Sequence, residues 1–292
     1  MTARNHLTLI NPQNGNLAFK VTSFDSGSFD HVQRFNYYSI VWLQDGSGTM
    51  HSDFNEYPVN AGTMMFFTPY QPFMLKSCEE IKGVALHFHP DFFCIYHHDK
   101  EVSCNGILFN NIYKPPYIKV DASAAPQFVH VLDQIRNEMM DADLSQYELL
   151  VSYLKIFMIK AVRIKNTQSP ELAKATANHK EPFVLQQLMD HIEKNFHRER
   201  QPGYYASVLN ITPKALGRIT KQHFNKTLTN LIAERIIIEA KRELYLTAKP
   251  VKTIAHELGF DDEFYFSRYF KNHTYISPQI YRDTVGFAVA EE

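Results

Sequence analysis

The sequence predicts two domains of different fold class, an all-β domain followed by an all-α domain. At roughly 100 to 200 residues per domain, a chain of 292 residues contains about two domains, each large enough to bury its own core. Apolar residues form short runs between turn residues from position 19 to 88, and recur at helical spacing from about position 122. The 45% hydrophobic and 21% charged residues exclude an intrinsically disordered chain.

Short strands are predicted between residues 19 and 88. The runs YYSIVWL, TMMFFTP and GVALHFHP alternate with Asp-Gly, Asn and Pro turns, a pattern typical of a small β barrel or sandwich. We expect Asp45-Gly46 to close a hairpin, because Asp-Gly suits the positive φ angles of a tight two-residue turn.

Two amphipathic helices are expected to follow the strands, at about residues 126–140 and 144–165, since apolar residues there repeat every three to four positions. The N-terminal domain is therefore predicted to span residues 1–165. Residues 166–181 are small and polar, contain prolines near both ends and lack an apolar face, as in a linker. The remaining domain, residues 182–286, has helical patterning throughout.

The charge distribution differs between these parts. Residues 1–181 carry 15 Lys and Arg against 18 Asp and Glu, a net −3, whereas residues 182–286 carry 15 against 11, a net +4. A mildly basic C-terminal domain suits a polyanionic partner.

Neither a membrane segment nor a disulfide framework is expected. No apolar run approaches the roughly 20 residues that cross a bilayer, and the first residues lack the apolar core of a secretory signal. We therefore expect a cytoplasmic location without a membrane partner. Three cysteines without CxxC spacing are predicted to be free thiols.

An internal repeat is the most informative feature of the C-terminal domain. In each copy a small residue precedes a turn residue, and an arginine follows in a second helix; the alanines are 49 residues apart and the arginines 50. This order is typical of a helix-turn-helix. The copies are Ala206-x-x-Leu209-Asn210-Ile211 with Leu216-x-Arg218, and Ala255-x-x-Leu258-Gly259-Phe260 with Phe266-x-Arg268.

The local turn and cap signals agree with this repeat. Asn210 and Gly259 occupy the turns, and they are the residue types that best tolerate a left-handed conformation. Thr212, followed by Pro213, is the expected N-cap of one second helix, and Asp261 or Asp262 that of the other. We therefore predict helix-turn-helix units at about residues 203–223 and 251–272.

A long helix is predicted between the two units, from Leu228 to about Leu246, because the segment is amphipathic and contains neither Gly nor Pro. At about 1.5 Å per residue such a helix spans roughly 28 Å. One turn of DNA measures roughly 34 Å, so two recognition helices could enter successive major-groove segments with some bending of the duplex.

At these residues the chain resembles the AraC/XylS-type transcriptional regulators, over residues 183–282. The chain departs from the family pattern at Thr220, where Phe is usual, and at Asn225 and Tyr275, where Gly commonly ends the recognition helix. The most specific part of the resemblance is Ile254-Ala255-x-x-Leu258-Gly259-Phe260-Asp261-Asp262-x-x-Tyr265-Phe266-Ser267-Arg268-x-Phe270-Lys271, followed by Ser277-Pro278-x-x-Tyr281-Arg282.

The resemblance implies an N-terminal cupin-like barrel with trailing helices that serve in effector binding and dimerisation, and a C-terminal DNA-binding domain. It thereby implies a sequence-specific transcription regulator, not an enzyme, that binds double-stranded DNA as a homodimer. An unknown small-molecule effector and RNA polymerase are the further partners of such a regulator, and no cofactor is implied. The sequence leaves open the operator, the effector and whether the protein is an activator or a repressor.

The outward faces of the two recognition helices are the expected DNA contacts. Arginine can form a bidentate pair with guanine, whereas lysine suits phosphate. The alternative is that Arg218 and Arg268 bind carboxylates within the domain. The expected DNA-binding residues are Lys214, Gly217, Arg218 and Lys221 in the first unit, and Glu263, Phe264, Ser267, Arg268 and Lys271 in the second.

Two sets of residues in the N-terminal domain suggest ligand chemistry. Tyr38 and Trp42 could line an effector pocket, although ordinary core packing is the favoured interpretation of each residue. His87 and His89 have the spacing that places two side chains on one face of a strand, as metal ligands require. The second functional hypothesis is therefore a metal-dependent cupin enzyme fused to a DNA-binding module. A full ligand pattern is lacking, so structural histidines are expected and no metal site is assigned.

Overall fold

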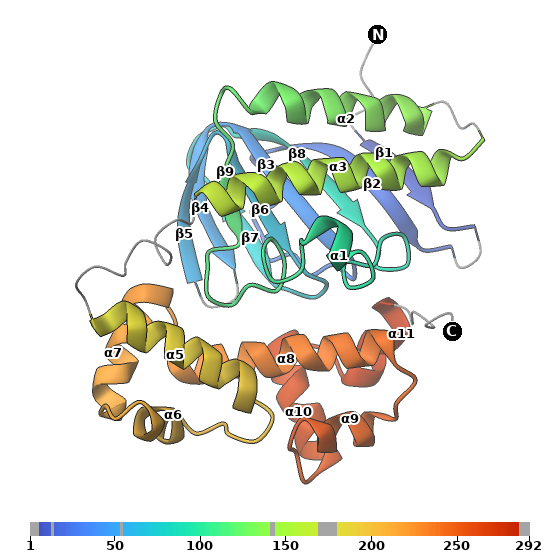
Figure 1. Ribbon diagram of the computed structural model, residues 1–292. Helices are drawn as coiled ribbons and strands as arrows, with labels where there is room; N and C mark the ends of the chain where they lie inside the picture. Colours follow the sequence, from blue (N-terminus) through green and yellow to red (C-terminus); the bar gives the residue numbers. More distant parts are fainter. Residues whose placement is uncertain (1–5, 13–14, 53–54, 141–143, 169–179, 286–292) are drawn as a thin grey trace. The chain divides into compact units, whose positions relative to one another are not determined.

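The computed structural model describes residues 6–12, 15–52, 55–140, 144–168 and 180–285, with side chains placed from residue 184 onward in the last range (Figure 1). The chain divides into two compact units. The N-terminal unit comprises Met1–Asn111 and Pro115–Gln168, and the C-terminal unit comprises Ile112–Lys114 and Ser169–Glu292.

The N-terminal unit contains two antiparallel sheets. The larger has six strands, in the spatial order β1 (His6–Ile10), β2 (Leu17–Asp25), β8 (Lys82–Phe88), β3 (Tyr38–Asp45), β6 (Thr63–Phe67) and β9 (Tyr117–Lys119). The smaller has three, in the order β5 (Asn55–Asn60), β4 (Ser47–Ser52) and β7 (Phe73–Lys76).

Each face of the larger sheet packs against a different partner. Side chains alternate along a strand, so Val41 and Leu43 of β3 join an aromatic-rich core with residues of the smaller sheet. Ile40 and Trp42 of the same strand face the opposite way, into a second core. Both faces of β3 are therefore buried, and the two sheets share a core, as in the small β barrel or sandwich that the turns and strands predict.

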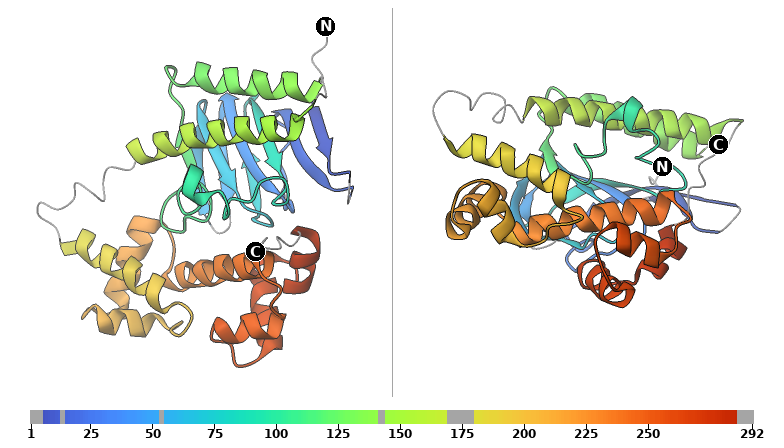
Figure 2. Two further views of the ribbon diagram at one scale, coloured as in Figure 1. Left: turned by 45° about the vertical axis from the view of Figure 1, so that its right-hand side comes forward. Right: turned by 60° about the horizontal axis from the view of Figure 1, so that its bottom comes forward.

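Helices cover the outer face of the larger sheet. α2 (Ala125–Met140) and α3 (Gln146–Thr167) run across it, and the short α1 (Asp99–Val102) lies in the segment that follows β8 (Figures 1 and 2). Phe128 of α2 and Phe157 of α3 are fully buried against this face. The two predicted trailing helices are thus confirmed.

The expected hairpin at Asp45-Gly46 is wrong. β3 pairs with β6 and β8, whereas β4 pairs with β5 and β7, so this turn carries the chain from one sheet to the other. Gly46 has the positive φ that the sequence indicates, +82°. A Cβ at this position would lie 2.5 Å from the carbonyl oxygen of Glu80. The close approach of the two backbones at this corner therefore also requires a residue without a side chain.

The C-terminal unit is all-α in its described residues. Its helices are α5 (Lys180–Asn195), α6 (Pro202–Val208), α7 (Pro213–Phe224), α8 (Leu228–Leu246), α9 (Val251–Glu257), α10 (Glu263–Thr274) and α11 (Pro278–Val285). Of the linker predicted at residues 166–181, positions 169–179 lie outside the described residues. No helix in the described ranges combines the length and apolarity needed to cross a bilayer.

Both predicted helix-turn-helix units form, one from α6 and α7 and the other from α9 and α10 (Figure 2). Their turn residues are left-handed, with φ of 53° at Asn210 and 75° at Gly259. Thr212 caps α7 by accepting a hydrogen bond from the Ala215 backbone N–H at 3.2 Å. Asp262, not Asp261, caps α10, because its carboxylate accepts from the first-turn backbone N–H groups.

The recognition helices end without glycine. Asn225 after α7 and Tyr275 after α10 are both left-handed, with φ of 56° and 69°. Asparagine adopts this conformation readily, whereas tyrosine does so at a cost of roughly 1 kcal/mol or more. Thr220, at the position where the family pattern has Phe, is completely buried. Its hydroxyl donates a hydrogen bond to the Gly217 carbonyl at 3.0 Å, so the buried polar group has a partner.

α8 joins the two units and has the predicted bounds. Leu231, Ile236, Ala240 and Leu244 are fully buried along its inner face. Arg282 of α11 donates to backbone carbonyls at the end of α8, including that of Leu244 at 3.1 Å. The Leu244 carbonyl, which the last turn of α8 leaves without an intrahelical partner, is thereby satisfied.

Gly259→Ala should unfold the second helix-turn-helix unit. Alanine would be held at a positive φ, and its Cβ would overlap the carbonyl oxygen of His197. We expect the free energy of unfolding to fall by at least ~2 kcal/mol, measured by urea titration of the helical circular-dichroism signal. Asn210→Gly, at the equivalent turn, is the control, with a change of less than ~1 kcal/mol. Equal stabilities of the two variants would contradict this account.

Candidate nucleic-acid interface

α7 presents a polar row on the side opposite its core contacts. Leu216 and Ile219 are buried, whereas Lys214, Arg218 and Lys221 are exposed. The helix begins at the Thr212 cap with Pro at its first position and has no acidic residue in its first turn. The predicted inward and outward positions of this helix therefore agree with the structure. Gly217 lies half-buried within the outward row.

α10 has the same arrangement with different chemistry. Phe266 and Phe270 are completely buried, and Tyr269 is half-buried against the ring of Phe260. The predicted contact residues on the outward side are the exposed Phe264, Arg268 and Lys271 and the half-buried Glu263 and Ser267. Phe264 is 76% exposed, an unusual position for a phenylalanine.

The two rows correspond position by position at an offset of 50 residues. Arginine and lysine recur at the third and fourth positions of the row, while the first position changes from lysine to phenylalanine. The second position holds a small residue in both helices. In order, the pairs are Lys214 and Phe264, Gly217 and Ser267, Arg218 and Arg268, and Lys221 and Lys271.

The cations of these rows differ from Lys226, Arg235, Arg242 and Lys249, which each contact a carboxylate partner. In the described parts of the chain, none of Lys214, Arg218, Lys221, Arg268 and Lys271 forms an ion pair. The alternative that Arg218 and Arg268 hold carboxylates of the domain therefore finds no support there.

Ion pairs of the C-terminal unit gather instead along α8. Arg235 contacts Glu193 at 2.7 Å and Glu239 at 3.0 Å. Further on, Arg242 and Lys249 contact Glu243 at 2.7 and 2.9 Å. These pairs neutralise several cations near the long helix, whereas the five cations of the outward rows have no such partner among the described residues.

Arg200 has a structural role that the sequence did not indicate. Its guanidinium lies 3.6 Å from the centre of the Phe260 ring, and its Nη2 donates to the Leu258 carbonyl at 3.0 Å. Arg200 thereby ties the segment after α5 to the turn of the second unit. The residue lies outside the internal repeat, so no pattern in the sequence distinguished it from other arginines.

Tyr38 and Trp42, the predicted effector-binding residues, lie in the core between the larger sheet and the helices. Tyr38 stacks on Phe88 with ring centres 5.1 Å apart, and Trp42 meets Phe128 at 6.0 Å. They are 4% and 3% exposed. Neither is among the residues that line the pocket beside His89 or the one beside His51, and their burial favours the core-packing alternative.

His87 and His89 do not share a site. His87 faces the barrel interior, where its Nδ1 lies 2.9 Å from the Ser39 hydroxyl. β8 ends at Phe88, so His89 belongs to the following turn and accepts from the Asp91 backbone N–H at 3.2 Å. Among the described residues, no group of three or more His, Cys, Asp or Glu side chains could hold a metal ion.

Burial sets the protonation state of His87. Desolvation, with a smaller contribution from Lys20, lowers its pKa from 6.5 to about 3. The imidazole is therefore neutral near pH 7, in an aromatic setting formed by Phe35 and Tyr37. This arrangement matches the expected structural histidine.

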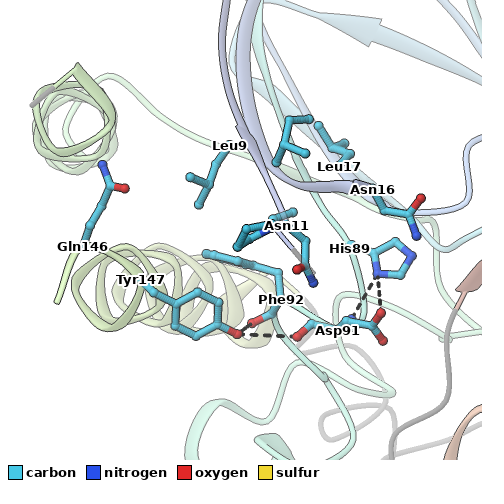
Figure 3. Close-up of a pocket in the computed structure, with 12 residues that line it drawn as sticks. Leu9, Asn11, Asn16, Leu17, His89, Asp91, Phe92, Gln146 and Tyr147 are labelled. Carbon is cyan, nitrogen blue, oxygen red and sulfur yellow. Dashed lines mark hydrogen bonds and ion pairs between the residues drawn. The ribbon is translucent and has the colours of Figure 1, made fainter. Parts of the chain in front are cut away.

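A pocket of about 410 Å³ lies beside the β1–β2 pair, the segment after β8 and the start of α3 (Figure 3). Leu9, Leu17 and Phe92 form its apolar wall. Tyr147 donates to the Phe92 carbonyl at 2.6 Å and closes one side. Its polar side chains are Asn11, Asn16, His89, Asp91, Gln146 and Tyr147. Amide, carboxylate and aromatic groups around one cavity suit a small polar ligand with an apolar face.

The comparisons with known proteins agree with this arrangement. Residues 205–284 match a family model described as a helix-turn-helix domain, so the C-terminal unit contains a domain of this kind. The raffinose operon transcriptional regulatory protein RafR of Pediococcus pentosaceus is 23% identical over 172 residues, 58% of this chain and 56% of that protein. The arabinose operon regulatory protein of Escherichia coli K12 is 24% identical over 167 residues, 57% of this chain and 54% of that protein.

The chain thus spans about half the length of the curated relatives that it matches. Among solved structures, ToxT from Vibrio cholerae O395 aligns with 93% of this chain and 99% of its own, at 16% identity and a TM-score of 0.41.

The N-terminal unit should lose stability in acid through His87. In the unfolded chain His87 binds a proton below pH 6.5, whereas in the folded unit it does so only near pH 3. The contribution of His87 to the free energy of unfolding is therefore complete above pH 6.5 and is lost as the pH falls. Between pH 7 and pH 5 we expect a loss of about 2 kcal/mol from this group. Trp42, the single tryptophan, reports unfolding of this unit by fluorescence. His87→Gln should flatten the dependence, and an unchanged slope would contradict the assignment.

Proposed function

We propose that this chain, whose residues 205–284 form an AraC-type helix-turn-helix domain, is a sequence-specific transcription regulator that binds double-stranded DNA. The observation that carries the proposal is the pair of matching outward rows on α7 and α10, with five cations that lack acidic partners in the described residues. Unpaired lysine and arginine at such positions bind phosphates and base edges.

The two recognition helices would read successive segments of the major groove. α8 separates them with its 19 residues, which at 1.5 Å each span roughly 28 Å. Arg218 and Arg268 would form bidentate pairs with guanine, and Glu263 would accept from a cytosine amino group. Phe264 would contact a thymine methyl group, and Ser267 a base or a phosphate. Lys214, Lys221 and Lys271 would bind phosphates and make binding weaker at high salt.

The N-terminal unit would bind the effector. Two relatives are named for the raffinose and arabinose operons, and the pocket beside Asn16 and Tyr147 offers groups that suit a saccharide. We therefore propose a small polar effector such as a saccharide. A saccharide that raises the unfolding temperature followed through Trp42 would support this, and the absence of such a ligand from a broad sugar panel would count against it.

The chain would act as a homodimer in the cytoplasm, with RNA polymerase as a further partner. Val129 of α2 and Leu149 and Ile156 of α3 are 39%, 40% and 42% exposed, on faces that the sheet does not cover. Exposed apolar residues on neighbouring helices are typical of a self-complementary contact. The relatives are named as regulators, so we propose a binding protein and no enzyme. Stoichiometric iron or manganese in the purified protein, lost in His87→Ala, would instead favour the metal-dependent cupin enzyme.

Selection of genomic DNA fragments on the full-length protein should recover a motif with two informative segments about one helical turn apart. Arg218→Ala and Arg268→Ala should each reduce affinity for this motif about tenfold or more, since each removes a bidentate base contact. Lys214→Ala should weaken binding to all DNA sequences by a similar factor. It should also lower the magnitude of the slope of log affinity against log salt concentration by about 0.9.

Arg198→Ala is the matched control, since Arg198 is an exposed arginine outside both recognition helices. Motif-free binding by the wild type, or wild-type affinity in both arginine variants, would contradict the proposed readout.

Sedimentation equilibrium should show a dimer that Ile156→Glu converts to a monomer, because the introduced carboxylate would be desolvated in the contact. His31→Glu changes charge at an exposed loop and should leave the dimer intact. A wild-type mass that stays monomeric across a wide concentration range would rule out the dimer.

A further inference from the structure

Gly217 lies in the interior of α7, the helix that spans Pro213–Phe224. Its backbone is helical and its φ is not in the left-handed region. A Cβ built at Gly217 meets no heavy atom within 4 Å in the described protein. The fold of the chain therefore gives no reason for a missing side chain at this position.

Other glycines of this chain do have such a reason. A Cβ on Gly48 would lie 2.5 Å from the Lys76 carbonyl oxygen, and one on Gly259 would overlap the His197 carbonyl oxygen. Apart from proline, glycine is the poorest helix former, so Gly217 lowers the stability of α7 without any gain in packing.

The location of Gly217 suggests what occupies the space that the absence of a side chain leaves. Gly217 lies between Lys214 and Arg218 in the outward row, one turn before Lys221. The equivalent position of α10 holds Ser267, also a small residue. Both recognition helices thus have their smallest outward side chain at the same place, beside the arginine.

We propose that Gly217 is the point of closest approach between α7 and DNA, where the bare helix backbone lies against base edges in the floor of the major groove. This inference rests on the proposed DNA-binding function. Glycine is the residue that permits close approach of a backbone to a ligand. A methyl group at this position would hold α7 away from the groove and lengthen the contacts of Arg218 and its neighbouring lysines.

The test compares Gly217→Ala and Gly217→Leu with Gly203→Ala in the full-length protein. Gly203 is a second helical glycine, exposed in α6, whose added Cβ also meets nothing within 4 Å. Because alanine favours helix, both alanine variants should melt at or a few degrees above the wild-type temperature by circular dichroism. Loss of folding is therefore separated from loss of binding.

Affinity is measured on the selected motif and on an unrelated duplex at the same salt. We expect Gly217→Ala to weaken motif binding at least tenfold and Gly217→Leu further, with smaller losses on the unrelated duplex. Gly203→Ala should stay within about twofold of the wild type.

Motif affinity of Gly217→Ala equal to or above the wild-type value would overturn the inference while leaving the proposed function standing. Equal losses on both duplexes would also overturn it, since base edges would then not be the contact. If the wild type binds neither duplex, the proposed function itself fails, and the role of Gly217 fails with it.

Discussion

Burial of the inner face of α8 is the constraint on which the C-terminal unit depends. Leu231 and Ile236 lie toward its beginning and Ala240 and Leu244 toward its end, all without solvent contact. Each fully buried leucine or isoleucine contributes roughly 1.5–3 kcal/mol. One helix therefore supplies core residues to both helix-turn-helix units and fixes their separation. The proposed reading of DNA by both helices together requires that this separation does not vary.

The charges of the unit are organised around the same helix. Arg235, Arg242 and Lys249 are each held by carboxylates on or near α8. The cations of α7 and α10 have no such partners among the described residues. A modest net charge can thus produce a local positive potential on the outward rows of α7 and α10, because part of the remaining positive charge is neutralised along α8.

What the sequence predicted well is determined locally. The caps at Thr212 and Asp262, the turns at Asn210 and Gly259 and the bounds of α8 follow from side chains within a few residues of each position. The repeat added a check, since two copies with one pattern are hard to obtain by chance. The outward rows of the candidate interface followed from helical periodicity alone.

What the sequence could not predict depends on distant partners. Asp45-Gly46 has the expected turn conformation, but which strands pair on either side of it is decided by residues far along the chain. The face of Trp42 was ambiguous because β3 is buried on both sides. The end of β8 at Phe88, which separates His87 from His89, has no local breaker before Pro90. Arg200 became informative only when the fold brought it to Phe260.

The differences between the two outward rows have one more consequence. Lysine in one row stands opposite phenylalanine in the other, and glycine opposite serine, so the repeat is a pseudo-symmetry rather than a symmetry. A single chain bound to a duplex would then present a different recognition helix toward each end of the DNA. A site read by one protomer in the proposed way would have two different segments, and their order would give the bound protein a direction along the DNA. Such polarity is what a protein needs to distinguish the upstream from the downstream side of a promoter.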